Sequence, residues 1–374
     1  MKNTDIQGIV QLGIERYGDN FKNYLENFPK LDYGDCQLNS QVRDLQYYED
    51  TYGNSVLREN ISFRESNKFK FNFDRDNIIL TNGVTHGIYL CLLLLKRKGY
   101  KRVFIPSPSY SGYKDICEIL DLEYFQYEMK DGFSNSFLDR IAHLNDCVII
   151  FNTPHNPSGA CLSSENIDKI KKNSINNVIY IFDCIYDEFI FKDDMILDWD
   201  DFFSNSFLKQ CFVVNSFSKG FGLPGLRLGW VVSCKHNISK LEPILERNLI
   251  CLNNIAQNIA ITVLSKDRTH FKKEIHERGK YLYKELSKIK ELECSLPYAG
   301  TTIMVRSNIV DVNLMIEYLM KKGVGLLPGK AYFGGRDNTF RLSFGYTYDE
   351  MNDFINEIKT AIFELLIKNE YVEV

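Results

Sequence analysis

Lys219 lies in a segment whose residue types suit the capture of an aldehyde that carries a phosphate. The segment, residues 215–230, reads NSFSKGFGLPGLRLGW and follows an apolar, β-branched stretch. Burial and a neighbouring positive charge lower the pKa of a lysine, and the uncharged amine can then form an imine with an aldehyde. The hydroxyls of Ser216 and Ser218, with the guanidinium of Arg227, would bind a dianionic phosphate. The alternative is a surface turn rich in serine and glycine that contains an ordinary lysine.

The same segment contains a glycine pattern that is also found in nucleotide-binding proteins. Gly220, Gly222 and Gly225 satisfy G-x-G-x-x-G, which in dinucleotide-binding domains opens the first strand–helix unit. Here the pattern follows the sixth expected strand, and another strand begins almost at once at Leu228. Lys330 does not belong to a Walker A loop, because valine and alanine occupy required glycine and hydroxyl positions. We therefore expect no nucleotide site.

Three further segments place polar groups where apolar stretches end. Residues 152–159 read NTPHNPSG, and their side chains can face a pocket at the carboxyl edge of a parallel sheet. Gly83 precedes an expected helix, and the first amides of that helix, at Val84 and Thr85, suit an anion. Asp183 closes a third stretch, where it could equally be a helix N-cap. Taken alone, each segment is also compatible with an ordinary turn.

The elements that must position these groups alternate along the chain from about residue 77. Helix-period stretches, such as residues 85–98, 113–120 and 163–173, lie between short β-branched runs. Apolar strands separated by helices indicate an α/β fold with a mostly parallel, seven-stranded sheet covered on both faces. The expected strands are residues 77–81, 102–105, 122–127, 147–152, 178–183, 211–216 and 228–233.

The chain is long enough for two domains. Its 374 residues exceed the size at which a single hydrophobic core stops growing. We expect a large domain at residues 46–235, which ends at the polar turn after the last of these strands. The remainder, residues 1–45 and 236–374, is expected to form a smaller α+β domain. Its expected elements are helices at residues 241–264 and 271–290 and strands near residues 301–305 and 340–344.

Composition argues against several classes of partner. The net charge of −4 gives no electrostatic reason to expect nucleic acid or a membrane surface. No apolar run approaches the roughly 20 residues that span a bilayer, and the first residues lack the pattern of a signal peptide, so we expect a cytoplasmic protein. The ten cysteines and six histidines show no metal-ligand spacing, so neither a metal site nor a disulfide framework is expected.

The pattern S-F-S-K-x-x-G-x-x-G-x-R-x-G at residues 216–229 resembles the cofactor-lysine signature of class I/II aminotransferases. These are fold type I enzymes that depend on pyridoxal 5′-phosphate (PLP), and they include aspartate and histidinol-phosphate aminotransferases. The resemblance spans about residues 46–345. It implies a fold type I enzyme in which Lys219 holds PLP as a Schiff base. It also implies a homodimer that moves an amino group between an L-amino acid and a 2-oxo acid.

The resemblance assigns roles on the ring side of the cofactor. Asp183 would pair with the pyridine nitrogen and keep it protonated, so that the ring withdraws electrons. Tyr186 and Asn156 would reach the phenolate oxygen, and Tyr110 would stack on the ring. With Lys219, the residues Asp183 and Tyr186 form the expected catalytic set.

It also assigns the phosphate and substrate sites. Tyr48, in a Y-x-D-x-x-G pattern, would reach the phosphate of the neighbouring subunit. Arg341 would clamp the substrate α-carboxylate, assisted by Asn156; taken alone, Arg341 could be an ordinary strand arginine. The phosphate group itself would be held by Gly83, Val84, Thr85, Ser216, Ser218 and Arg227.

Several alternatives remain open at this stage. The same constellation supports C–S β-elimination, decarboxylation or oxygen-dependent oxidation of an amino acid. A non-catalytic PLP-binding sensor is disfavoured, because no helix-turn-helix or basic arm is attached and an arginine stands at position 341. About the first forty residues do not align, and in such enzymes that segment often lines the substrate pocket. Cys184 departs from the family pattern, where an acidic residue is common, with little expected effect. Lys330 or Arg336 could meet an acidic or phosphorylated substrate, or could simply be solvated.

Overall fold

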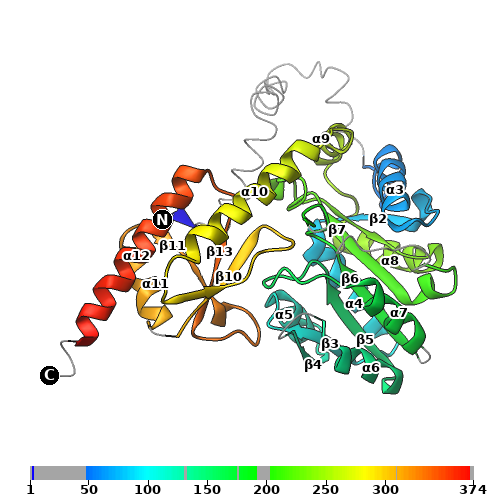
Figure 1. Ribbon diagram of the computed structural model, residues 1–374. Helices are drawn as coiled ribbons and strands as arrows, with labels where there is room; N and C mark the ends of the chain where they lie inside the picture. Colours follow the sequence, from blue (N-terminus) through cyan, green and yellow to red (C-terminus); the bar gives the residue numbers. More distant parts are fainter. Residues whose placement is uncertain are drawn as a thin grey trace, which may run out of the picture.

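The computed structural model describes residues 2–3, 48–129, 133–174, 177–191, 203–308 and 310–370. They form a larger unit built on one sheet and a smaller unit beside it, on whose far side helix α12 lies (Figure 1). None of the described helices is long and apolar enough to cross a membrane.

The larger unit is built on a seven-stranded sheet with the order β2-β8-β7-β6-β5-β3-β4. β8 runs antiparallel to both of its neighbours, whereas β7, β6, β5, β3 and β4 pair in parallel. The expected α/β class and the mostly parallel seven-stranded sheet are therefore confirmed. The strands are β2 (Ile78–Thr81), β3 (Arg102–Ser107), β4 (Glu123–Glu128), β5 (Cys147–Asn152), β6 (Val178–Asp183), β7 (Cys211–Ser216) and β8 (Gly229–Val232).

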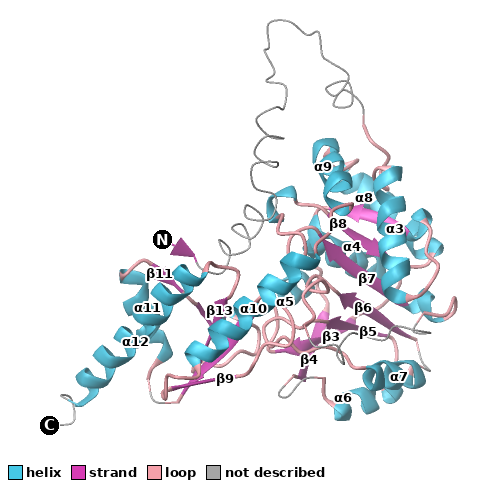
Figure 2. Ribbon diagram, turned by 45° about the horizontal axis from the view of Figure 1, so that its top comes forward, coloured by secondary structure: helices cyan, strands magenta, loops and turns pink. Residues whose placement is uncertain are grey.

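Helices cover both faces of this sheet, as Figure 2 shows. Neighbouring residues of a strand point to opposite faces, so Ile149 and Phe151 of β5 belong to one core and Val148 and Ile150 to the other. The first core is closed by α3 (Ser55–Phe69), α6 (Asn135–Arg140), α7 (Ser164–Asn173) and α9 (Asn254–Leu264). The second is closed by α4 (Gly83–Arg97), α5 (Gly112–Ile119) and α8 (Lys235–Leu249).

The smaller unit has its own core around a four-stranded antiparallel sheet of order β12-β13-β10-β9. Tyr186 and Phe189, from the loop after β6, pack into this core and so join the two units. Its strands are β9 (Leu292–Cys294), β10 (Thr302–Ser307), β12 (Leu327–Pro328) and β13 (Thr339–Ser343), and β1 (Lys2–Asn3) pairs separately with β11 (Val324–Gly325). Its helices are α10 (Thr269–Leu286), α11 (Val312–Lys321) and α12 (Tyr348–Glu370). Among the described residues, the 3₁₀ turns are η1 (Arg75–Asn77), η2 (Ile141–His143), η4 (Phe207–Gln210), η5 (Pro224–Leu226) and η6 (Gly329–Ala331).

The helix expected at residues 241–264 is two helices, α8 and α9. The chain turns at Ile250, whose φ of 64° lies in the left-handed region. Asn253 then caps α9 by accepting a hydrogen bond from the amide of Ala256 at 3.1 Å. A continuous apolar pattern does not reveal this break, because both helices bury apolar faces.

The packing of α8 and α9 also bears on the domain boundary. Leu241 and Leu245 of α8 lie in one core of the large sheet, and Ile259 and Val263 of α9 lie in the other. After α9, the next residues along the chain that belong to the second unit's core are those of α10, such as Phe271. We therefore propose that the large domain ends near residue 265, in place of the expected boundary at residue 235.

A buried group of charges ties α3 to the loop after β6. Nη2 of Arg64 lies 2.7 Å from Oδ2 of Asp187 and 2.7 Å from Oε1 of Glu188. Nζ of Lys68 lies 2.6 Å from the same Asp187 oxygen. Burial alone would raise the pKa of Asp187, but Arg64 and Lys68 outweigh it and hold that pKa well below its usual range. Asn215, in β7, also donates to Asp187 at 2.8 Å.

The same group reaches the smaller unit through Glu188. Arg268, the residue before α10, places Nη2 3.1 Å from Oε1 of Glu188. Lys272, in the first turn of α10, places Nζ 2.8 Å from Oε2. We call these residues, with Arg64, Lys68 and Asp187, the charge network.

Replacing Arg64 by methionine is expected to lower the free energy of unfolding by about 3–5 kcal/mol, because it leaves Asp187 and Glu188 buried with too little compensation. Urea unfolding followed by tryptophan fluorescence measures the change. The control is Lys288→Met, which removes an exposed ion pair with Glu285 and should cost about 0–1 kcal/mol. An Arg64→Met protein as stable as the control would show that the charge network does not hold the units together.

Candidate active site

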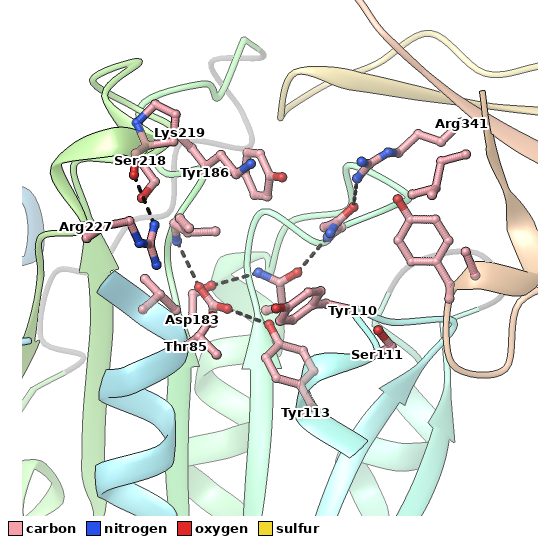
Figure 3. A pocket seen from close by; sticks show the side chains of 18 residues that line it. Thr85, Tyr110, Ser111, Tyr113, Asp183, Tyr186, Ser218, Lys219, Arg227 and Arg341 are labelled. Atoms are coloured by element: carbon pink, nitrogen blue, oxygen red, sulfur yellow. Dashed lines mark hydrogen bonds between the residues drawn. The ribbon is translucent and has the colours of Figure 1, made fainter. Parts of the chain in front are cut away.

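A cavity of about 550 Å³ opens at the carboxyl ends of β5, β6 and β7, between the large sheet and the smaller unit (Figure 3). Its size is typical of a small-molecule site. Most of the predicted site residues line it, namely Val84, Thr85, Tyr110, Asn156, Asp183, Tyr186, Ser218, Lys219, Arg227 and Arg341.

Lys219 follows β7 and is only partly exposed. Burial disfavours the charged ammonium, and the nearby Arg227 guanidinium repels it, so the pKa of Lys219 falls to about 8. Near neutral pH a much larger fraction of this lysine is therefore uncharged than of an ordinary lysine, and the uncharged amine can act as a nucleophile or base. The burial of Lys219 and its position near Arg227 thus favour the imine formation that was expected from the sequence.

An anion-binding corner lies beside Lys219. It combines the first residues of α4 with the guanidinium of Arg227, and Val84 and Thr85 line the cavity there. Gly83 has a φ of 81°, and a Cβ at this position would lie 3.0 Å from Nη2 of Arg227. The glycine therefore lets the guanidinium approach the helix N-terminus closely.

Three backbone segments meet behind this corner. A Cβ at Gly229 of β8 would lie 2.7 Å from the carbonyl oxygen of Asn215 and 2.9 Å from the carbonyl carbon of Gly83. Real Cβ contacts are longer, so a larger residue at position 229 would force backbone apart. The end of β7, the start of α4 and β8 are thus packed at a fixed separation.

Asp183 lies at the end of β6, opposite Asn152 of β5 in the sheet register. It is almost fully buried, and burial raises the pKa of its carboxyl to about 6. Two hydrogen bonds oppose the rise: the Tyr113 hydroxyl donates to Oδ2 at 2.5 Å, and the amide of Ile185 donates to Oδ1 at 3.1 Å (Figure 3). The carboxylate suits a cationic partner in the cavity, which would lower this pKa again.

Tyr113 was missed as a site residue at the sequence level. It lines the cavity from α5, and its ring meets that of Tyr110 edge to face, with centroids 5.6 Å apart. A tyrosine three residues after Tyr110 on a helix is a weak signal, because its contact with Asp183 depends on how α5 docks on the sheet.

Arg341 projects from β13 of the smaller unit toward the loop after β5. Its Nη1 donates to Oδ1 of Asn156 at 2.7 Å, and its guanidinium lies over the ring of Tyr332, 5.3 Å from the centroid. The side chain is buried, which lowers the pKa of Arg341 to about 9. A carboxylate bound here would raise this pKa again and gain bidentate hydrogen bonds from the guanidinium.

Some predicted residues lie outside the lining. Ser216 is fully buried, and its Oγ accepts from the amide of Ser218 at 3.1 Å, so it supports the loop from beneath. Tyr48 is 79% exposed and does not line the cavity of its own chain. Cys184 is buried with a pKa raised to about 12 by burial, so it is a protonated thiol.

These groups fit PLP. The amine of Lys219, with its lowered pKa, would bind the aldehyde of PLP. The anion-binding corner would hold its phosphate, and the buried carboxylate of Asp183 would pair with its ring nitrogen. Their convergence at the carboxyl edge of a mostly parallel sheet defines a PLP-dependent enzyme of fold type I.

The chain belongs to the class I and II aminotransferase family, whose model matches residues 8–358. The family depends on PLP, so the predicted family, cofactor and enzyme class are confirmed, and the chain is a PLP-dependent aminotransferase. The other PLP reactions and the non-catalytic sensor are not favoured.

Relatives agree with this assignment. The chain is 29% identical over 341 residues to an aspartate aminotransferase of Sulfolobus acidocaldarius, covering 83% of each chain. It is 25% identical over 309 residues to a histidinol-phosphate aminotransferase of Methanocaldococcus jannaschii, covering 81% of this chain and 79% of that one. The crystal structure of an aspartate aminotransferase from Thermotoga maritima matches with a TM-score of 0.76 at 20% identity, over 94% of this chain and 96% of that one, and so shares the fold.

Replacing Tyr113 by phenylalanine is expected to raise the pKa of Asp183, because the hydroxyl stabilises the ionised carboxylate. The acid limb of the pH profile of kcat/KM should then move up by about half to one pH unit, the equivalent of one hydrogen bond. Tyr127→Phe is the matched control, since its buried hydroxyl donates to the Ile150 carbonyl instead. An acid limb that does not move would show that the Tyr113 hydroxyl does not affect the pKa of Asp183.

Proposed function

We propose that Lys219, Asp183 and Arg341 carry amino transfer between an L-amino acid and a 2-oxo acid. The observation that supports this most is that an amine, a carboxylate and a guanidinium, all with pKa values shifted by burial, line one cavity. Shifted pKa values that cluster in a cavity are typical of catalytic sites.

When bound, PLP supplies the aldehyde that receives the amino group and a ring that withdraws electrons from the substrate α-carbon. Nζ of Lys219 would take the proton from the substrate α-carbon as general base and return it later in the half-reaction. Asp183 would keep the ring nitrogen protonated. Tyr113 orients the Asp183 carboxylate for this task.

The smaller unit would orient the substrate. Arg341 would bind the α-carboxylate through a two-pronged hydrogen bond, and Asn156 fixes the guanidinium from the large unit. The substrate would thus be held on both sides of the boundary between the two units. Tyr186 would face the phenolate oxygen, and Tyr110 would cover the ring.

The phosphate would lie in the anion corner. The amides of Val84 and Thr85, the hydroxyl of Ser218 and the guanidinium of Arg227 supply hydrogen bonds and positive charge. Gly83 and Ser216 act indirectly, the first by leaving space and the second by supporting the loop.

The half-reaction with single amino acids tests the assignment. A donor added without any 2-oxo acid should convert the absorbance of the bound cofactor to that of its amine form, because the amino group stays on the enzyme. Lys219→Ala should lose the lysine-linked absorbance and slow transfer by at least ~10²-fold, the contribution of a general base. Release of ammonia, CO₂ or peroxide without the amine form would refute amino transfer, and a Lys219→Ala protein with unchanged absorbance would refute the lysine assignment.

We further propose a cytoplasmic homodimer in which Tyr48 serves the neighbouring subunit's phosphate site. The exposure of Tyr48, outside its own cavity, supports this role. Light scattering should give twice the chain mass, and Tyr48→Phe should weaken PLP binding. A monomer with full activity would show that Tyr48 does not serve the phosphate site of a neighbouring subunit.

A further inference from the structure

Lys219 begins a tight turn, residues 219–222, which we call the lysine turn. The amide of Gly222 donates to the carbonyl oxygen of Lys219 at 3.0 Å and closes the turn. Gly220 and Phe221 are its two central residues, and the side chain of Phe221 is fully buried. A group that holds these two residues therefore also fixes the backbone from which the Lys219 side chain projects.

Arg268 contacts the lysine turn through the ring of Phe221. Its guanidinium carbon lies over that ring, 4.1 Å from the centroid. This is the geometry of a cation–π contact, which is stronger where water is excluded, and the Arg268 side chain is only 14% exposed. Because Arg268 directly precedes α10, the contact joins the start of the smaller unit to the lysine turn.

Glu188 supports the other central residue of the turn. A Cβ at Gly220 would lie 2.5 Å from Cγ and 2.9 Å from Cβ of Glu188, so the Glu188 side chain fills the space beside the Gly220 backbone. Burial alone would raise the pKa of Glu188, but Arg64, and then Arg268 and Lys272, outweigh it and hold that pKa below its usual range. The ionised carboxylate, with Oε1 3.1 Å from Nη2 of Arg268, thus holds the guanidinium beside the turn.

The pKa of Lys219 depends on how firmly the lysine turn is held. Burial, and then the Arg227 guanidinium, lower this pKa to about 8. A turn that can shift would admit water to the amine, and hydration favours the charged form. The other charged side chains that the described part of the chain places in the cavity lining belong to other elements, so they can stay unchanged when the turn is loosened; they are Asp183, Arg227 and Arg341.

We propose that Arg268 is a positioning residue for Lys219, which it holds in place by stacking on Phe221 and by its ion pair with Glu188. Arg268 is not among the described residues that line the cavity, so it acts through the lysine turn. The inference rests on the proposed role of Lys219. It means that the smaller unit bears on the amine that would take the α-proton, as well as on the substrate carboxylate.

The test follows the lysine-linked absorbance of the holoenzyme as a function of pH. The midpoint of its change reports the ionisation of the Lys219 nitrogen that is linked to PLP. In Arg268→Lys the ion pair with Glu188 can persist, but the flat guanidinium that covers Phe221 is lost. We expect the midpoint to rise by about half to one pH unit, because a looser turn lets water stabilise the charged form.

Phe221→Leu removes the same contact from its other side and should raise the midpoint by a similar amount. The double variant Arg268→Lys/Phe221→Leu should shift it no further than either single variant, because both changes act on one contact. Lys272→Met is the matched control: Nζ of Lys272 lies 2.8 Å from Oε2 of Glu188, so the change removes a positive charge from the same carboxylate and leaves the stack on Phe221 in place. Its midpoint should equal that of the wild type.

Wild-type midpoints in both Arg268→Lys and Phe221→Leu would overturn the proposal. An equal shift in Lys272→Met would also overturn it, because the charge around Glu188, and not the contact with Phe221, would then act on Lys219. If none of the proteins shows lysine-linked absorbance, the proposed role of Lys219 itself fails. Equal midpoints in proteins that do show this absorbance would refute only the role of Arg268.

Discussion

The charge network around Arg64 holds together the parts of the molecule that must work together. It joins α3, the loop after β6, β7 and the start of α10, and so links the large sheet to the smaller unit. Burying charges is costly, and such a group persists only when each charge is compensated. The loop that it holds begins directly after Asp183, the last residue of β6, and carries Tyr186 before it reaches Asp187. The network thus fixes the backbone from which two of the proposed catalytic groups project.

Two carboxylates, one at the end of β6 and one in the loop after it, show how environment sets function. Asp187 is held ionised by Arg64 and Lys68, and its role is structural. Asp183 lies four residues earlier, is equally buried, and accepts hydrogen bonds from Tyr113 and Ile185 that only partly offset burial. Its pKa of about 6 leaves it ready for a cationic partner. The same side-chain type therefore serves as an anchor at one position and as a reactive group at the other.

Much of the large unit could be predicted from the sequence, because its strands are continuous apolar runs that end in polar residues. The cofactor segment was also predictable, since Lys219, Arg227 and the serines lie within a few residues of one another. The break between α8 and α9 could not be predicted, because the left-handed turn at Ile250 leaves no mark in the apolar pattern. Nor could the sequence predict which sheet these two helices pack against, since an apolar helix face has the same pattern whichever core it covers. The contacts of Tyr113 and Tyr332 depend on docking between elements far apart in sequence, which spacing does not encode.

The close approach of Gly229, Asn215 and Gly83 leaves no room for a larger residue behind one side of the cavity. Behind the anion corner, backbone meets backbone, so even an added methyl group has no room. Across the cavity, the lining includes Tyr332 and Leu327 of the smaller unit. Over evolutionary time, variation would accumulate on the second side and be removed on the first. Descendants of such a chain would share one cofactor chemistry while diverging in the amino acids they accept.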